Sequence, residues 1–289
     1  MASLKEVKTR IASVNSTRKI TSAMKMVASS KLHHAQQSIE QMRPYESKLN
    51  ELMTTFVTAM EGEVSSPYAV KRDVERVAIV VFSSNSSLCG GFNGNVVKQL
   101  RKSIDQYKEG GAEVVAIHPI GKKVAEATRK MGFPLLTDLS STLDHPAYAP
   151  IAELSKSLME QFETGEIDKV EIIYHHFKSA GSQILQTEQL LPITISDSTT
   201  QQVSDSPNYI IEPSLEVLIE QLIPKALHLK LYSAMLDSLA SEHAARVIAM
   251  QVATDNADEL LRELTLQYNK TRQQAITAEL LDIVGGSFS

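Results

Sequence analysis

Two very long stretches without helix-breaking residues, one at each end of the chain, constrain the fold more than any other feature. Neither Gly nor Pro occurs between Met1 and Arg43, and neither occurs in the 60 residues from Lys225 to Val284. At a rise of 1.5 Å per residue, an unbroken helix over the second stretch would be about 90 Å long. Since helices of globular proteins usually run about 8–20 residues, the pattern predicts a coiled coil. Such a helix must project from any compact domain, and something else must surround the projecting part.

The carboxyl-terminal stretch carries the clearest coiled-coil pattern. Its apolar and small residues recur in steps of four and three, which is the spacing of a coiled-coil seam. We expect the seam to run along His243, Val247, Met250, Thr254, Ala257, Leu261, Leu264, Tyr268, Thr271, Ala275 and Ala278. The segment Ile276–Val284 is apolar on more than one face, which is typical of a buried helix. Because this segment lies at the far end of the helix, we expect a partner to bury it.

The amino-terminal stretch has a matching but less regular pattern. Its apolar steps are first Leu4, Val7, Ile11 and Val14, then Ile20, Met24 and Val27, and later Leu32, Ala35, Ile39, Met42, Glu46, Leu49, Met53, Phe56 and Met60. Pro44 should kink this helix or begin its next segment. The two terminal helices must be antiparallel if they pair, because one domain connects them, and their 3.5-residue repeat predicts a left-handed supercoil.

The middle of the chain alternates strands with helices. We expect strands at residues 76–83, 113–118, 169–177 and 183–191, and helices at 95–107, 121–131 and 151–162. Alternation over residues 76–177 predicts a parallel, doubly wound sheet, to which the last hairpin adds an antiparallel edge. The fold class is therefore α/β: a long antiparallel coiled coil of N- and C-terminal helices with a central Rossmann-like domain. We expect three segments: 1–61 (first helix), 74–195 (central domain) and 208–289 (last helix), with a polar linker at 196–208.

Composition narrows the cellular setting. The chain carries a net charge of −5, yet residues 1–31 hold seven Lys or Arg and one acidic residue, Glu6. A basic helix on an acidic body suggests an acidic partner, although a solvated helix face explains the same charges. The longest apolar run, Val77–Phe82, is far shorter than the ~18–20 residues that cross a bilayer. The charged beginning does not resemble a signal peptide, so a bacterial cytosolic location is the simplest interpretation.

No catalytic, cofactor-binding or metal-binding constellation emerges from the residues. The glycine-rich stretch 83–95 follows a strand and precedes a helix, where a phosphate loop would lie, but it matches neither nucleotide-binding pattern. The adjacent pairs His33-His34 and His175-His176 cannot direct both rings to one metal ion from a helix or a strand. The single cysteine, Cys89, excludes an intrachain disulfide, and we expect a buried structural thiol. We therefore expect no catalytic residue, no cofactor and no metal.

At three places the sequence resembles the gamma subunits of F-type ATP synthases. Lys5–Leu32 (KEVKTRIASVNSTRKITSAMKMVASSKL) is similar to that family's first helix, and Leu88–Asn95 (LCGGFNGN) to its Leu-Cys-Gly-Gly turn. Ser241–Gly286 is similar to the family's last helix along its full length. The chain departs from the family at Asn85-Ser86-Ser87, where Asp-Arg-Gly is common, and at Ser287, where Ala is usual. It also lacks the cysteine pair of the chloroplast type, so thiol control is not expected.

The resemblance implies a central rotor shaft. Its coiled coil would lie within a ring of three alpha and three beta subunits, while the central domain would rest with epsilon on the membrane-embedded c-ring. Rotation of the c-ring, driven by protons, would turn the shaft and change the beta catalytic sites in sequence. The same implication extends to regulation of ATPase activity and of proton flow. The chain would be a non-catalytic peripheral subunit at the cytoplasmic face of the bacterial inner membrane, reaching the membrane only through the c-ring.

The resemblance also assigns candidate contact residues, position by position. Contacts with beta would involve Met24, Lys25, Arg246, Arg272, Gln273, Thr277 and Glu279. The foot toward epsilon and the c-ring would involve Tyr209, Glu212 and Pro213. Each has a plainer explanation as well; Arg272 and Glu279, for instance, could simply share one solvated helix face.

Two other functions remain open on the residues alone. A Rossmann-like enzyme with helical appendages would need a cofactor fingerprint, which residues 83–95 do not supply. A coiled-coil scaffold or nucleic-acid binder would explain the basic amino-terminal stretch, but that stretch lacks base-stacking aromatic residues.

Overall fold

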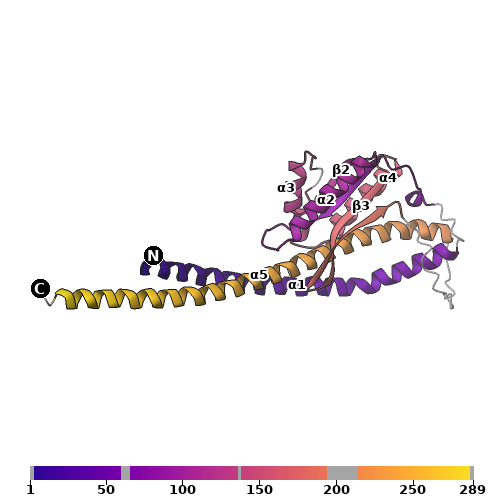
Figure 1. Ribbon diagram of the computed structural model, residues 1–289. Helices are drawn as coiled ribbons and strands as arrows, with labels where there is room; N and C mark the ends of the chain where they lie inside the picture. The colour runs from indigo at the N-terminus through magenta and orange to yellow at the C-terminus, as the bar shows by residue number, and fades with distance from the viewer. Residues whose placement is uncertain (1–2, 60–65, 136–137, 194–213, 287–289) are drawn as a thin grey trace. The chain divides into compact units, whose positions relative to one another are not determined.

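The computed structural model describes residues 3–59, 66–135, 138–193 and 214–286 (Figure 1). The chain divides into two compact units, which we describe separately. One unit contains residues up to Ser30 together with those from Arg246 onward, and the other contains Lys31–Ala245. Both long helices contribute to both units, so the three segments expected from the sequence remain predictions as separate domains. Within the described ranges, no helix is both long enough and apolar enough to span a bilayer.

The larger unit is built on a four-stranded sheet of order β2-β1-β3-β4. Strands β1 (Arg76–Phe82), β2 (Glu113–Ile120) and β3 (Lys169–Ser179) are parallel, and β4 (Ser182–Leu191) is antiparallel to β3 at one edge. In this register Val80 of the central strand lies between His118 of β2 and Ile172 of β3. The predicted parallel sheet with an antiparallel hairpin edge is confirmed.

Helices cover both faces of this sheet. Helices α2 (Phe92–Glu109) and α3 (Lys122–Lys130) bury one face through side chains such as Val96, Leu100 and Val124. The other face packs against α4 (Tyr148–Glu163) and against the first part of α5 (Leu215–Gly286). Two short 3-10 helices, η1 (Pro67–Ala69) and η2 (Ser140–Leu143), lie in the connections. Because both faces are covered, the central strand reads as one continuous apolar run, with every side chain from Val77 to Phe82 buried.

Strand β2 extends two residues beyond the predicted end. The sequence suggested a stop at His118 because Pro119 cannot donate a hydrogen bond to a neighbouring strand. However, β2 is an edge strand, so one side of its backbone has no strand to pair with. Pro119 therefore fits in the ladder opposite Val81 without costing a hydrogen bond.

Both long helices continue through a proline. Helix α1 runs from Leu4 to Ala59 with Pro44 inside it, and α5 begins at Leu215, ten residues before the breaker-free stretch, with Pro224 inside it. A proline removes one helical hydrogen bond and disfavours the preceding turn. Around Pro224, burial of Ile219, Ile223 and Leu227 in the core offsets this cost.

Close packing and polar bonds hold the long helices to the sheet within the larger unit. Leu32 and Ala35 of α1 pack against Ala240 and Ala244 of α5, where small side chains let the helices approach closely. Strand β3 is tied to α5 by polar contacts. His176 Nδ1 lies 2.5 Å from Asp237 Oδ2, and Ser241 Oγ donates to the carbonyl oxygen of His175 over 3.1 Å. In each of these contacts the two residues are more than 60 positions apart in the chain.

Gly121, between β2 and α3, meets two independent constraints. Its φ of +116° lies in a region that favours glycine, and a Cβ there would lie 2.4 Å from the carbonyl oxygen of Ser83. Gly132 also has a positive φ, +91°, but a Cβ there would meet no atom within 4 Å. Substitutions at Gly121 and Gly132 therefore distinguish the energetic cost of backbone strain from that of steric contact.

We expect Gly121→Ala to lower the free energy of unfolding by about 3 kcal/mol or more, and Gly132→Ala by only about 1 kcal/mol. The larger loss follows because the new methyl group must displace backbone at the end of β1. Urea titration of the full chain, followed by circular dichroism, measures both values. Equal losses in the two variants would show that the contact with Ser83 does not affect the free energy of unfolding.

Candidate functional site

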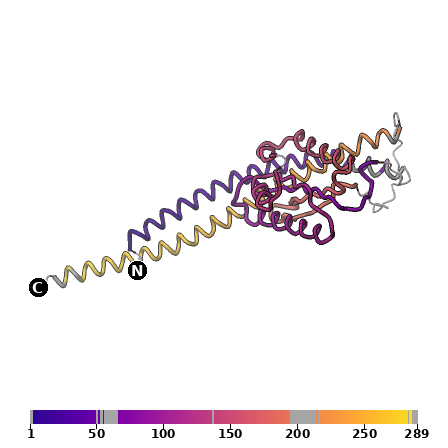
Figure 2. Tube along the Cα trace, turned by 90° about the horizontal axis from the view of Figure 1, so that it is seen from above, coloured from indigo at the N-terminus to yellow at the C-terminus, as the bar shows by residue number. Residues whose placement is uncertain are grey.

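The smaller unit is an antiparallel coiled coil formed by Leu4–Ser30 of α1 and Arg246–Gly286 of α5, whose helices run side by side in both views (Figures 1 and 2). Three polar pairs cross its seam. Arg18 Nη1 lies 3.0 Å from Asp258 Oδ1, the hydroxyls of Thr21 and Thr254 are 2.8 Å apart, and Lys25 Nζ donates to Gln251 Oε1 over 2.7 Å. In each pair the residue numbers sum to 275 or 276, which sets one continuous register. The predicted antiparallel pairing is confirmed.

On α1, large apolar side chains of this stretch face outward, and a polar side chain occupies part of the buried seam. The buried seam positions after Val14 are occupied by Thr21 and Ala28, while Ile20 and Val27 are 60% and 59% exposed. The interpretation that placed Ile20 and Val27 in the seam is therefore wrong. The reason is phase: steps of four and three from Val14 lead to residues 18, 21, 25 and 28, and the next apolar residues fall on another face.

Ile20, Met24 and Val27 form a row, which we call the outer apolar row; Ile20 and Val27 are exposed, and Met24 is partly exposed. Their spacing of four and three places them on one side of α1, away from the seam. On α5, Ile248 and Val252 are likewise exposed on the side turned away from the seam. Elsewhere α5 presents exposed acidic side chains at Asp255, Glu259 and Glu263. The surface of the coiled coil therefore differs from side to side, with apolar and acidic strips in different places.

Helix α1 has a well-defined beginning. The backbone N–H of Ser3 donates to Glu6 Oε2 over 2.8 Å, and the N–H of Glu6 donates back to Ser3 Oγ, which makes a capping box. By the register of the seam, Leu4 lies opposite residues 271 and 272 of α5. Helix α5 continues from there to Gly286 without a partner helix among the described residues (Figure 2).

The unpaired end of α5 is strongly apolar. We call this segment, residues 276–284, the tip; its side chains Ile276, Leu280, Leu281, Ile283 and Val284 are 45–66% exposed. Leaving these large apolar side chains in water is unfavourable, because each Å² of exposed apolar surface costs roughly 25 cal/mol of free energy. An exposed patch of this kind is typical of a surface that a partner covers.

The candidate contact residues fall into three groups. Met24, which belongs to the outer apolar row, and its neighbour Lys25 lie partly exposed on α1, whereas Arg246 is only 7% exposed. Arg272, Gln273, Thr277 and Glu279 are all exposed at or beyond the level where α1 begins. Tyr209, Glu212 and Pro213 lie outside the described residues. Of the exposed α5 candidates, Thr277 and Glu279 therefore lie in the tip, and Arg272 and Gln273 lie just before it.

The outer apolar row itself was missed by sequence reasoning. The signal was present in the chain: extending the four-and-three step from Val14 selects Arg18, Thr21 and Lys25 for the seam. Polar residues in a predicted seam looked less probable than the apolar residues nearby. Their partners Asp258, Thr254 and Gln251 on the other helix compensate for burial, and that compensation becomes visible only when the two helices are paired.

The carboxyl end of the parallel sheet is the second candidate site, because open α/β sheets bind ligands there between strands whose connections diverge. In this chain that point lies between β1 and β3. The ring of Phe92 stacks on the ring of His175 there, with centroids 4.4 Å apart. Burial lowers the pKa of His175 to about 4, so the imidazole is neutral at pH 7. An apolar ring on a neutral imidazole offers no charge to a phosphate.

The first turn of α3, which could otherwise bind an anion through its N–H groups, is already satisfied. The backbone N–H groups of Lys122, Lys123 and Val124 donate to Asn85 Oδ1, the Ser84 carbonyl and Ser83 Oγ, at 3.2, 3.1 and 3.0 Å. The residues that follow β1 therefore occupy the N–H donors at the start of α3, which are no longer available to an anion.

The turn around Cys89 is held by internal bonds. Leu88 adopts a positive φ of +68°, and the Asn93 side-chain amide donates to Ser84 Oγ and to Cys89 Sγ, at 2.8 and 3.1 Å. The predicted buried thiol at Cys89 is confirmed. Among the described residues, no three His, Cys, Asp or Glu side chains converge to hold a metal ion.

Comparison with known proteins identifies close relatives. A family model described as ATP synthase matches residues 3–289. The ATP synthase gamma chain of Phocaeicola vulgatus is 55% identical over 290 residues, and that of Bacteroides fragilis is 57% identical over 291 residues, each covering all of both chains. The ATP synthase gamma chain of Flavobacterium johnsoniae is 46% identical over 287 residues, covering 99% of this chain and 98% of the relative.

Solved structures share the fold at lower identity. The rotor of the Euglena gracilis mitochondrial ATP synthase aligns with a TM-score of 0.65 at 19% identity, over 94% of this chain and 98% of that one. A chain from the central stalk and c-ring of the Tetrahymena thermophila mitochondrial ATP synthase aligns with a TM-score of 0.59 at 22% identity, over 81% and 99%. These likenesses agree with the arrangement of helices and sheet described above.

The register of the coiled coil can be tested by crosslinking. In a Cys89→Ser background, we expect Thr21→Cys/Thr254→Cys to form an interhelical disulfide on mild oxidation, because the native hydroxyls are 2.8 Å apart. The control pair Thr21→Cys/Thr265→Cys is displaced by three turns along α5 and should stay reduced. Thiol titration and denaturing gel mobility measure the outcome. A disulfide in the control pair, or none in the test pair, would contradict the register.

Proposed function

The chain belongs to the ATP synthase gamma chain family, and from this membership we propose that it is the non-catalytic central rotor shaft of a bacterial F-type ATP synthase. The coiled coil lies inside a ring of three alpha and three beta subunits. The sheet domain, with epsilon, rests on the c-ring, so that the chain is peripheral to the cytoplasmic face of the inner membrane. Proton-driven rotation of the c-ring turns the shaft, which drives ATP synthesis at the beta sites and regulates ATPase activity and proton flow.

One observation carries this proposal: polar pairs cross the seam of the coiled coil at the level where large apolar side chains of α1 face outward. Polar pairs bind its two helices together across the seam, while Ile20 and Val27 are more than half exposed. A coiled coil that functioned in water would favour the opposite arrangement. The outer apolar row and the apolar tip are consistent with a helix pair whose surroundings are protein, as inside a sleeve of other subunits.

The uneven surface supports a coupling role. A two-helix coil has no three-fold symmetry, so three surrounding beta subunits contact different sides of it at any one orientation. Each side presents different chemistry, either the outer apolar row or the acidic strip at Asp255, Glu259 and Glu263. One subunit can shift another between conformational states only if its contacts with those states differ. As the uneven shaft rotates, each beta subunit contacts these different surfaces one after another.

The candidate residues take roles in this proposal by position. Met24 of the outer apolar row and its neighbour Lys25 contact beta along the side of the coil, with Arg246 more enclosed. Arg272, Gln273, Thr277 and Glu279 contact beta around the single-helix end. Tyr209, Glu212 and Pro213 form the foot toward epsilon and the c-ring. The lack of catalytic function is part of the same proposal, and the filled crevice at Phe92 and His175 supports it.

We expect Met24→Lys to uncouple the assembled enzyme more than it destabilises the chain. The partly exposed position accepts a longer side chain, so the free energy of unfolding should change by less than about 1 kcal/mol. The added cation would form an ion pair with an acidic partner surface in some orientations only, and would resist rotation out of them. Met24→Leu, which conserves volume and apolarity, should remain coupled.

Inverted membrane vesicles that contain the full complex measure this coupling, as protons pumped per ATP hydrolysed. We expect the ratio to fall by roughly half or more in Met24→Lys, since an ion pair of about 1 kcal/mol changes populations about fivefold. The Met24→Leu ratio should match that of the unmodified complex. An unchanged ratio in both variants, or failure of the chain to co-purify with alpha and beta subunits, would refute the proposal.

A further inference from the structure

The outer layer of the sheet domain offers a surface that holds none of the candidate contact residues of the proposed rotor function. Helices α2 and α3 cover one face of the sheet, whereas α4 and the long helices cover the other. Within the larger unit, a partner bound to α2 and α3 would therefore leave α1 and α5 uncovered.

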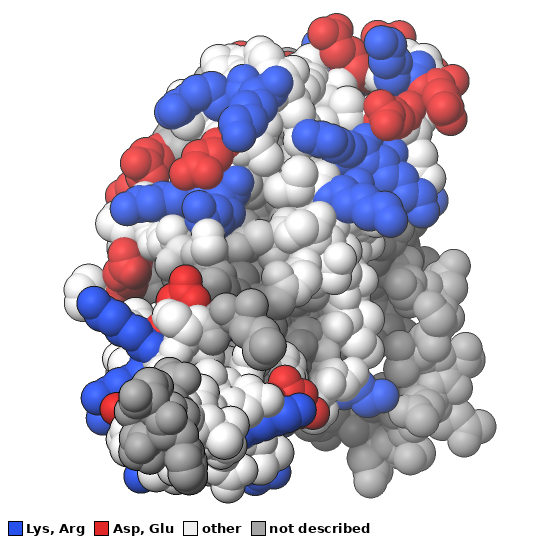
Figure 3. Space-filling view, turned by 60° about the vertical axis from the view of Figure 1, so that its left-hand side comes forward, with Lys and Arg blue, Asp and Glu red and all other residues white. Residues whose placement is uncertain are grey.

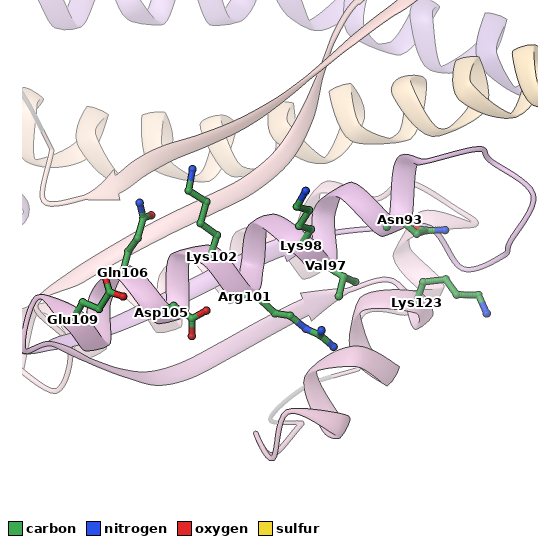
Figure 4. Close-up of a pocket in the computed structure, with 10 residues that line it drawn as sticks. Asn93, Val97, Lys98, Arg101, Lys102, Asp105, Gln106, Glu109 and Lys123 are labelled. Carbon is green, nitrogen blue, oxygen red and sulfur yellow. The ribbon is translucent and has the colours of Figure 1, made fainter.

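A shallow open groove of about 760 Å³ runs along the outer side of α2 and reaches the start of α3 (Figure 4). Gly94 and the half-buried Val97 give it a short apolar section. Around this section stand four cations: Lys98, Arg101, Lys102 and, from α3, Lys123. Further along α2 the lining becomes acidic, at Asp105 and Glu109. The groove is therefore graded in charge from one end to the other.

Among the described residues, three of the four cations at the positive end of the groove have no ion-pair partner. Residues 92–130 hold eight Lys or Arg and four Asp or Glu, in a chain whose net charge is −5. Lys123 pairs with Glu126 at 3.7 Å, but within the described ranges no ion pair involves Lys98, Arg101 or Lys102. The space-filling view shows groups of Lys and Arg side chains on this face, with Asp and Glu side chains next to them (Figure 3). Like charges at this helical spacing repel one another, so an anionic partner would relieve an existing cost.

We propose that this groove docks an acidic segment of a partner polypeptide. Carboxylates of the segment face Lys98, Arg101, Lys102 and Lys123, and an apolar side chain rests on Val97. The end of the segment near Asp105 and Glu109 is neutral or basic. This inference does not depend on the rotor function.

The graded charge is the reason for choosing a polypeptide. A nucleic-acid backbone or an anionic bilayer presents negative charge at even spacing, and Asp105 and Glu109 would repel it along part of the groove. Side chains of a polypeptide can vary from one helical turn to the next and match both ends. Complementary charges of this kind determine specificity and orientation more than affinity.

The test uses the full chain and a synthetic fluorescein-labelled peptide of about 14 residues, which spans about 21 Å as a helix. The peptide carries Glu in its first turns, one Leu per turn and Lys in its last turn. The control peptide has Gln in place of each Glu. Fluorescence anisotropy at low salt measures binding, and amide hydrogen exchange locates it.

Two protein variants each remove three positive charges, the first from α2 alone and the second from α2 and α3. Lys98→Gln/Arg101→Gln/Lys102→Gln neutralises the groove, and Lys108→Gln/Arg129→Gln/Lys130→Gln neutralises exposed positions that do not line it. We expect the groove variant to bind the peptide at least about tenfold more weakly and the control variant to remain within about twofold of the unmodified chain. Exchange should slow in α2 and not in α5. Circular dichroism verifies that both variants fold.

Four results would overturn the proposal. The unmodified chain could fail to bind the peptide, or could bind the Gln control peptide equally well. The two variants could lose binding equally, which would indicate net charge alone. Vesicles containing phosphatidylglycerol, or an oligothymidylate, could bind more tightly than the peptide with the same dependence on Lys98, Arg101 and Lys102, which would identify a membrane or nucleic-acid surface instead.

Discussion

The polar seam between α1 and α5 is the interaction on which the candidate site depends. Arg18 with Asp258, Thr21 with Thr254 and Lys25 with Gln251 set a single antiparallel register. The face of α1 that carries these residues is the one joined to α5, so the pairs also indicate which helix face points inward. Once that face is set, the apolar residues between them must point outward, and the apolar tip must extend beyond the start of α1. The outward apolar surface is thus a consequence of the seam.

The sheet domain shows how a nucleotide-binding architecture can serve as a structural support. The crevice where such folds take a ligand contains the stacked rings of Phe92 and His175, and the carbonyl oxygen of His175 accepts a bond from Ser241 of α5. The donors at the start of α3 are used by the residues that follow β1. Groups that could have bound a ligand instead join the sheet, its loops and the long helix. The fold class alone therefore says little about activity.

Much of this fold was predictable because its signals are local. Continuous β-branched runs identified the buried strands, and the absence of breakers identified the long helices. The errors arose where tertiary contacts override local preference. Pro119 is tolerated because β2 is an edge strand, and Pro224 because neighbouring residues are buried in the core. Ile20 and Val27 were wrongly counted among the apolar steps of the seam. Polar residues occupy seam positions there, and their partners lie more than 230 positions away. Roles of the contact residues depend on partner chains and stay predictions.

The most direct test of the account is the accessibility of the outer apolar row in the free chain and in the assembled enzyme. Cysteines at Ile20 and at Val27, in a Cys89→Ser background, would be labelled with a maleimide, and Lys178→Cys, exposed on β3, provides the reference. We predict fast labelling of positions 20 and 27 in the isolated chain and labelling slower by about tenfold or more once alpha and beta subunits surround it. Equal rates in the two states would mean that nothing encloses the coiled coil, and would contradict the account.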